Sequence, residues 1–201
     1  MIYFFDNYEN FKSEKFIDFL PKERKEKFDR FRFQRDKDNC LAAYLLFLVG
    51  LKEHNIRNTD IALTENGKPY LESNEIRFNI SHCSQGVAVA FSQTPVGIDV
   101  QEIEPVSDGV MKRIFTQNEI ESVKTAEDFT TVWTLKESVV KCKGEVLADM
   151  EKYSFEKRSE KFEKYGKKFS VFRHKNIILS VCSDRQYDDI IIINDFGGLL
   201  K

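Results

Sequence analysis

Apolar and polar positions alternate in short runs along the first half of the chain, and one long stretch shows helical spacing instead. The apolar run IYFF near the start predicts a short strand, and residues 21–54 predict mainly helix that ends in CLAAYLLFLVGL. Asn66-Gly67 is a strong hairpin signal and predicts strands on both sides of the turn. Three further strands are predicted over IRFNI, GVAVAF and VGIDV.

The second half has the same mixture of elements without repeating the sequence. Helices are predicted at about 107–125 and 127–143, and strands over KKFSVFRH, NIILSVCSD and DDIIIIND. Each half therefore carries helices and a short, mostly antiparallel sheet. We predict an α+β protein with two similar α/β-type lobes, at residues 1–96 and 97–201.

Two strands combine an apolar face with polar groups that suit a binding site. In VGIDVQ, period two directs Val96, Ile98 and Val100 to a core and Asp99 and Gln101 to the other face. Side-chain oxygens two residues apart can converge on a hard cation. An ordinary polar strand face is the competing interpretation.

The segment FNISH alternates in the same way. Phe78 and Ile80 point inward, whereas Asn79 and Ser81 point outward. His82 falls at the end of this strand, where a histidine usually caps or packs but can also donate to a phosphate when it is protonated.

The segment WTLKESVVK places charges on an apolar helix face. Apolar side chains fill one arc of this helix, namely Val132, Trp133, Leu135, Val139 and Val140. Lys136 projects from inside the arc, and Glu137 lies at its edge. The simplest interpretation is a surface ion pair of Glu137 with Lys141, while Lys136 extends its methylenes over the core.

Composition narrows the choice of partners only slightly. The chain has 201 residues, enough for one large domain or two small lobes, and a net charge of −2 that indicates no particular partner. Residues 22–37 and 141–175 are mainly basic, and residues 97–104 are acidic. Such patches are usually solvated, but they also suit the two sides of a site for a phosphate and its metal.

Several classes of protein are disfavoured. The four cysteines are far apart and show no zinc-binding spacing, which predicts reduced thiols in a cytoplasmic protein. Acidic residues come too early for a signal peptide, and no apolar run approaches the roughly 20 residues that span a bilayer. Glycine-rich phosphate loops are absent, so a phosphate site would depend on side chains. We expect neither a nucleic acid nor a membrane as partner.

The order of motifs is more specific than any single motif. A basic helix is followed by GKP (67–69), FNISH (78–82), VGIDV (96–100), FTQNE (115–119) and WTLKES (133–138). Over residues 20–150 this order resembles the 4′-phosphopantetheinyl transferases of the surfactin-synthetase-activating type. The resemblance implies two similar lobes with the site between them.

The resemblance also implies a reaction. Members of this family, like holo-[acyl-carrier-protein] synthase, transfer the 4′-phosphopantetheine arm of coenzyme A to a serine of an acyl, peptidyl or polyketide carrier protein. Adenosine 3′,5′-bisphosphate is the second product, and Mg²⁺ bridges the pyrophosphate. Two lobes in one chain favour a monomer.

The family's catalytic and metal-binding residues match positions of this chain. Asp99 and Glu137 match metal carboxylates, and Gln101 stands where the motif has a further carboxylate. Asp99, Glu137 and Lys141 are the catalytic candidates. The serine proton would pass to Glu137 or to a water on the metal, and the sequence does not choose between them.

The coenzyme A contacts are matched in the same way. The candidates are basic, polar or ring-bearing residues from four motifs: Arg24 and Lys27 for the 3′-phosphate, Lys68 and Pro69 beside the adenine, and Ser81, His82, Lys136 and Lys141 for phosphates. Glu119 matches a family glutamate, whereas Cys40 replaces a threonine and Val146 a glycine. Because Gln101 breaks the metal motif, a non-catalytic module that binds coenzyme A or a carrier is the alternative. A metal phosphohydrolase is a weaker third hypothesis.

Overall fold

Two four-stranded sheets form the centre of the molecule. The computed structural model describes residues 1–105, 108–156 and 159–200. The first sheet consists of β1 (Ile2–Phe5), β4 (Arg77–His82), β5 (Val87–Ser92) and β10 (Ile191–Ile192), in the order β10-β1-β5-β4. The second is antiparallel and consists of β6 (Gly97–Glu102), β7 (Lys161–Lys164), β8 (Lys167–His174) and β9 (Ile177–Ser183), in the order β6-β9-β8-β7.

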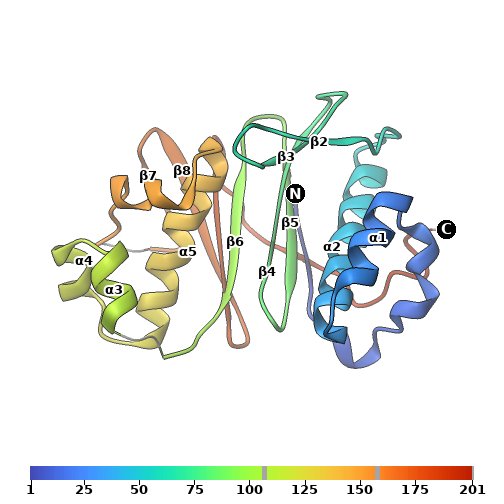
Figure 1. The fold of residues 1–201 in the computed structure, drawn as a ribbon. Helices are drawn as coiled ribbons and strands as arrows, with labels where there is room; N and C mark the ends of the chain where they lie inside the picture. The colour runs from blue at the N-terminus through green and yellow to red at the C-terminus, as the bar shows by residue number, and fades with distance from the viewer. Residues whose placement is uncertain (106–107, 157–158, 201) are drawn as a thin grey trace.

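Helices cover the outer side of each sheet. Figure 1 shows α1 (Lys22–Arg30) and α2 (Gln34–Glu53) beside the first sheet, and α3 (Asp108–Ile114), α4 (Gln117–Ser122) and α5 (Ala126–Lys143) beside the second. The hairpin of β2 (Ile61–Leu63) and β3 (Pro69–Leu71) lies across one end. Four short 3₁₀ turns complete the elements of the described residues: η1 (Tyr8–Asn10), η2 (Ser13–Lys15), η3 (Ile17–Phe19) and η4 (Leu147–Lys152).

Separate apolar cores lie between these layers. Phe47 of α2 and Phe91 of β5 belong to the first core. Phe4 and Ile98 belong to a second core between the two sheets, and Leu135 of α5 to a third core against the second sheet. The prediction of helices packed on small sheets in two lobes is confirmed.

The predicted elements are mostly present, with shifted boundaries. The helical stretch 21–54 is interrupted at residues 31–33 and forms α1 and α2. The helix expected from about 107 is two helices, because Thr116 starts a new one through a capping box with Glu119; residue 107 lies outside the described residues. The strand expected over 188–195 is reduced to β10, and β7 was not expected.

The end of the chain does not stay with the second lobe. β10 pairs in parallel with β1 of the first sheet. Phe196 is fully buried, and its ring centroid lies 4.9 Å from that of Phe5. The assignment of all of 97–201 to the second lobe is therefore wrong for this tail, because the apolar tail completes the first core. The boundary between residues 96 and 97 remains a prediction.

Helix α5 lies unusually close to β6. A Cβ atom on Gly97 would lie 2.1 Å from the backbone oxygen of Ser138, so only glycine permits this approach. The helix ends at Gly144, whose left-handed φ of 71° is the usual C-terminal cap. This close packing places one face of α5 directly over the β6 side chains.

Candidate functional site

Polar side chains join the two sheets where their edge strands β4 and β6 meet. The side-chain oxygen of Asn79 accepts a hydrogen bond from the Ile98 amide at 2.8 Å, and Ser81 Oγ accepts one from the Val100 amide at 3.2 Å. Side chains of β4 thus satisfy backbone donors that an edge strand otherwise leaves unpaired. The predicted outward direction of Asn79 and Ser81 is confirmed, although both are buried against the other lobe.

Asp99 is the centre of the cluster at this junction. Its side chain is 1% exposed. Oδ1 accepts hydrogen bonds from Ser81 Oγ at 2.8 Å and Lys141 Nζ at 2.6 Å, and Oδ2 accepts one from Gln101 Nε2 at 3.4 Å. Asp99 and Gln101 therefore share a face, as strand parity predicts, and groups from β4, β6 and α5 converge on one carboxylate.

Glu137 adds a second carboxylate. It lies one turn before Lys141 on α5, with Oε2 3.7 Å from Lys141 Nζ. Burial raises the pKa of Glu137, and the negative charge of Asp99 raises it further, while Lys141 lowers it. The two carboxylates are thus close enough to repel each other, and one ammonium group offsets part of that repulsion.

The donor set fits a magnesium ion completed by other ligands. Within residues 1–105, 108–156 and 159–200, no three His, Cys, Asp or Glu side chains cluster as a metal cage. Mg²⁺ usually keeps several waters and takes one or two protein carboxylates together with substrate phosphates. Two mutually repelling carboxylates beside a shared cation match this requirement, and Gln101 lies beside them with its amide nitrogen toward Asp99.

Lys136 is not part of this cluster, contrary to the sequence-based expectation. Its side chain is fully buried, and Nζ lies 3.0 Å from a carboxylate oxygen of the equally buried Glu119. It also donates to the backbone oxygens of Met150 and Tyr153. The expected phosphate contact is therefore wrong here, because a complete set of acceptors encloses the ammonium group on another side of α5.

Lys68 is also held by the protein. Its Nζ donates to the backbone oxygens of Val96 at 3.0 Å, Lys141 at 2.6 Å and Cys142 at 3.3 Å. Burial lowers the pKa of Lys68. Its ammonium group fastens the hairpin to the end of α5, while Pro69 lines a neighbouring cavity.

The basic residues of α1 lie on the other side of the junction. The Arg24 guanidinium stacks 4.9 Å from the Tyr44 ring centroid, and Lys27 is exposed. Partial burial lowers the pKa of His82, and the Lys141 and Lys27 ammonium groups lower it further. The carboxylates of Asp36 and Asp99 raise the pKa of His82 and partly offset this effect, so His82 lies among charges of both signs from both lobes.

Some contributors were missed from the sequence. Asn79 was recognised only as an outward-facing residue, although its alternation with Phe78 and Ile80 was visible. No local pattern in the sequence predicts the pairing of Glu119 with Lys136, because this ion pair forms only through the tertiary contact between α4 and α5. Glu102 lies away from the carboxylates, as parity predicts, and accepts hydrogen bonds from Ser84 and Gln85.

No helix in the described part of the chain is long and apolar enough to cross a membrane.

Comparison with protein families identifies both parts of the chain. Residues 95–187 match the model described as 4′-phosphopantetheinyl transferase superfamily. Residues 9–94 match the model described as 4′-phosphopantetheinyl transferase, N-terminal. The two matched regions therefore meet between β5 and β6, beside the cluster around Asp99.

Individual relatives agree with these family matches. The chain is 30% identical over 146 residues to the 4′-phosphopantetheinyl transferase Sfp of Bacillus subtilis (strain 168), covering 68% of this chain and 65% of that protein. It is 32% identical over 134 residues to the 4′-phosphopantetheinyl transferase gsp of Aneurinibacillus migulanus, covering 62% and 56%. The similarity thus spans just under two thirds of the first relative and little more than half of the second.

Proposed function

Because the chain belongs to the 4′-phosphopantetheinyl transferase superfamily, we propose that it transfers the 4′-phosphopantetheine arm of coenzyme A to a serine of an apo carrier protein. The bond from the serine oxygen to the phosphorus of the arm forms, and the bond from that phosphorus to the adenosine-linked phosphate breaks. Adenosine 3′,5′-bisphosphate leaves. This is the activity of a holo-[acyl-carrier-protein] synthase, with an acyl, peptidyl or polyketide carrier as acceptor.

The convergence of the two lobes on Asp99 supports this proposal most directly. Ser81 comes from the N-terminal matched region, and Asp99, Glu137 and Lys141 come from the superfamily region. A site made from both regions presents carboxylates, an ammonium group and a hydroxyl within one buried cluster. That combination suits a pyrophosphate with its metal.

Asp99 and Glu137, assisted by Gln101, would hold Mg²⁺. When bound, the ion supplies positive charge that stabilises the phosphate oxygens of the substrate and leaving group. The chain itself would supply further charge, because Lys141 Nζ lies 2.6 Å from Asp99 Oδ1 and 3.7 Å from Glu137 Oε2. Ser81 Oγ and His82 would orient the phosphates, and Glu137 would accept the serine proton.

A cavity beside the hairpin suits the nucleotide. It has a volume of about 520 Å³, and its wall includes the rings of Pro69, Tyr70, Phe78 and Pro95. Apolar rings of this kind, two of them aromatic, suit contact with an adenine ring. Arg24 and Lys27, which lie on α1, would bind the 3′-phosphate of coenzyme A.

Intact-mass measurement of a carrier protein tests the activity. The purified protein, coenzyme A and Mg²⁺ are incubated with a panel of apo carriers of the acyl, peptidyl and polyketide types. We expect one carrier or more to gain the mass of the phosphopantetheine arm. No gain on any carrier would contradict the proposal.

Because Gln101 departs from the metal motif, the alternative function is that of a non-catalytic module of the same fold that binds coenzyme A or a carrier. Such a module would bind coenzyme A in a titration and leave every carrier unmodified. Retention of Asp99, Glu137 and Lys141 in one hydrogen-bonded and ion-paired cluster favours the enzyme. We propose that the enzyme acts as a cytoplasmic monomer.

A further inference from the structure

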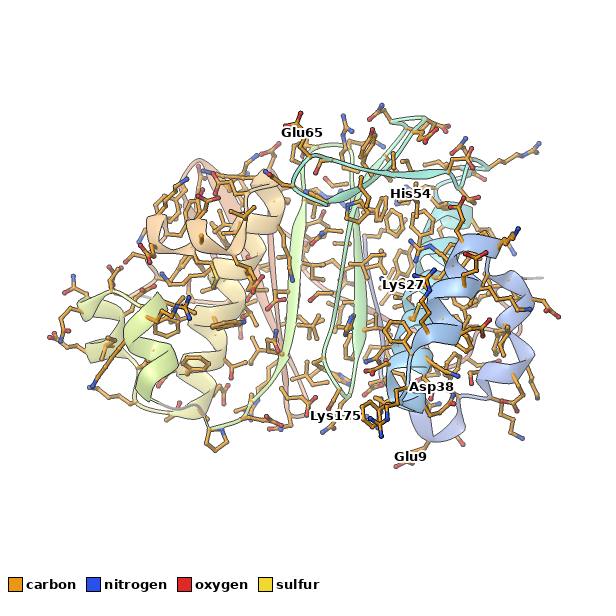
Figure 2. All side chains as sticks on the ribbon, viewed as in Figure 1. Glu9, Lys27, Asp38, His54, Glu65 and Lys175 are labelled. Atoms are coloured by element: carbon orange, nitrogen blue, oxygen red, sulfur yellow. The ribbon has the colours of Figure 1, made fainter. Side chains whose placement is uncertain are left out.

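Two buried cysteines lie behind the wall of the nucleotide cavity, which is the cavity beside the hairpin of β2 and β3. Cys142 is in the last turn of α5 and Cys182 is near the end of β9, and both belong to the core between α5 and the second sheet. Cys142 also lines the nucleotide cavity. Figure 2 shows Glu65, another residue of that cavity, at the upper end of the molecule, where α5 ends in Figure 1. The cluster around Asp99 uses neither thiol.

Gly97 of β6 brings the two cysteines together. On β9, Cys182 is the register partner of Gly97. On α5, the Cys142 backbone nitrogen would lie 2.3 Å from a Cβ atom at Gly97. Because glycine has no such atom, α5 lies close enough to the sheet for the two thiol groups to form a hydrogen bond. Both thiols are reduced in this structure.

The contact makes the two thiols chemically unequal. The hydrogen bond from the Cys182 thiol lowers the pKa of Cys142, burial raises it, and the ammonium groups of Lys167 and Lys68 lower it. The same contact raises the pKa of Cys182, and burial raises it further. Because the thiolate is the reactive form of cysteine, Cys142 is the nucleophile of the pair and Cys182 is the thiol that keeps its proton.

A small oxidant has access to the nucleophile. Cys142 is only 2% exposed, but it forms part of the wall of a cavity of about 520 Å³. Hydrogen peroxide is little larger than water and fits such a space. Cys182 is fully buried behind Cys142, so an oxidised Cys142 has a second thiol beside it and is itself the first to meet the oxidant.

We propose that Cys142 and Cys182 are a peroxide-sensitive pair that is oxidised to a disulfide. The Cys142 thiolate attacks one oxygen of hydrogen peroxide, the O–O bond breaks, and a sulfenic acid and hydroxide form. The Cys182 sulfur then attacks the Cys142 sulfur, so that the S–S bond forms and the S–O bond breaks. The Cys182 proton and the proton first released by Cys142 complete two molecules of water. Two thiols are thereby oxidised and one peroxide is reduced.

The disulfide should loosen the nucleotide cavity. A covalent bond holds two sulfur atoms closer than a hydrogen bond does. Strand β9 is fixed between β6 and β8, so the end of α5 is the part that shifts. The backbone oxygens of Lys141 and Cys142 accept hydrogen bonds from Lys68 Nζ and fasten the hairpin, so their shift disturbs the cavity wall. This consequence rests on the proposed function, which places the nucleotide in that cavity.

Peptide mapping tests the disulfide directly. The protein is treated with hydrogen peroxide, unfolded, alkylated and cleaved after glutamate, which releases the two cysteines in separate peptides, residues 138–145 and 164–201. We expect these peptides to be joined after peroxide and separated by a reducing agent, while Cys40 and Cys83 are alkylated. Alkylation of both Cys142 and Cys182 after peroxide would overturn the inference.

Titration with adenosine 3′,5′-bisphosphate tests the effect on the cavity. This product is preferred to coenzyme A because it has no thiol that could reduce the disulfide. We expect the oxidised protein to bind it about tenfold more weakly than the reduced protein, and a reducing agent to restore the affinity. Equal affinities of the two forms would overturn the coupling of the pair to the cavity.

Three variants separate the roles of the thiols, each compared with itself before and after peroxide. Cys142→Ala lacks the nucleophile, so its affinity should stay within twofold. Cys182→Ala should leave Cys142 as a sulfenic acid, which dimedone traps. Cys83→Ala, the matched control, keeps the pair and should lose affinity as the wild type does. A loss of affinity in Cys142→Ala would show that another group responds, and thermal unfolding checks that all three variants are folded.

Failure of this inference is distinguishable from failure of the proposed function. Neither the peptide map nor the titration requires a carrier protein. Unlinked peptides would overturn the disulfide while transfer to a carrier still proceeds. A reduced protein that modifies no carrier would contradict the proposed function, and the peptide map would still decide whether the disulfide forms.

Discussion

Glu137 is the residue whose replacement should separate activity from folding. Glu137→Gln removes a charge but keeps the shape of the side chain. Lys141, which pairs with Glu137, keeps its second ion pair, with Asp99 at 2.6 Å. Transfer to a carrier should fall by a factor of a hundred or more, about 3 kcal/mol of transition-state stabilisation. The unfolding midpoint should hardly change, and Glu127→Gln on the same helix is the control. Near-native transfer with unchanged Mg²⁺ dependence would contradict the assignment.

Gln101 should set the strength of metal binding in the absence of substrate. With an amide in place of a carboxylate, the site has one negative charge fewer and should bind Mg²⁺ weakly until coenzyme A supplies phosphate oxygens. Gln101→Glu should tighten Mg²⁺ binding without coenzyme A and preserve transfer. Gln101→Ala should be milder than Asp99→Ala, because Asp99 accepts three side-chain hydrogen bonds and Gln101 donates one of them. Metal titrations and transfer rates for the three variants measure this ranking. An equal loss of transfer in Gln101→Ala and Asp99→Ala would refute it.

At the scale of elements, α1 should provide selectivity for the 3′-phosphate. Arg24 and Lys27 are one turn apart; burial raises the pKa of the nearby Cys40 thiol, and the charges of Lys27 and Arg24 offset part of that rise. A charge-assisted contact to a phosphate contributes about 1.5–3 kcal/mol. Replacing both residues with alanine should raise the KM for coenzyme A and reduce the preference over dephospho-coenzyme A. Alanines at the exposed Lys25 and Arg30 of the same helix are the control, and wild-type selectivity in the Arg24/Lys27 variant would show that α1 does not face the ligand.

The buried pair of Lys136 and Glu119 should hold α4, α5 and η4 together. Glu119 also accepts hydrogen bonds from the amides of Thr116 and Phe155, at 2.8 Å each. Lys136→Met should destabilise the protein by about 3–5 kcal/mol, because it leaves a buried carboxylate without its cation. Adding Glu119→Gln removes that charge, keeps an acceptor for one of the two amides, and should restore part of the loss in denaturant unfolding. A double variant as unstable as Lys136→Met would contradict this explanation.

At the scale of the whole molecule, the end of the chain should stabilise the lobe that forms its beginning. Phe196 packs against Phe5 and Phe11 of the first core. Phe196→Ala should cost about 3–5 kcal/mol of unfolding free energy, as buried phenylalanines usually do. Phe33→Ala, at a position 63% exposed, should cost little. Equal effects of the two substitutions in denaturant unfolding would show that the tail is dispensable.

The sequence by itself determined the elements and the direction of side chains along them. Period two placed Asp99 and Gln101 on one face and Glu102 on the other, and the spacing of Glu137 and Lys141 placed them together on a helix. The order of motifs indicated the family. These inferences succeed because strand and helix periodicity are local properties of the backbone.

Tertiary structure alone decided which of these groups meet. Lys136 and Lys141 both lie on α5 and match the same motif, yet one ammonium group is enclosed by Glu119 and backbone carbonyls while the other reaches Asp99. Whether a buried lysine faces a ligand or a protein carboxylate depends on elements distant in the sequence. Here α4 and η4 surround Lys136, whereas β4 and β6 lie beside Lys141. The pairing of the tail with β1 also depends on elements distant in the sequence. An apolar segment packs where a core is incomplete, and the sequence of the segment does not show which core that is.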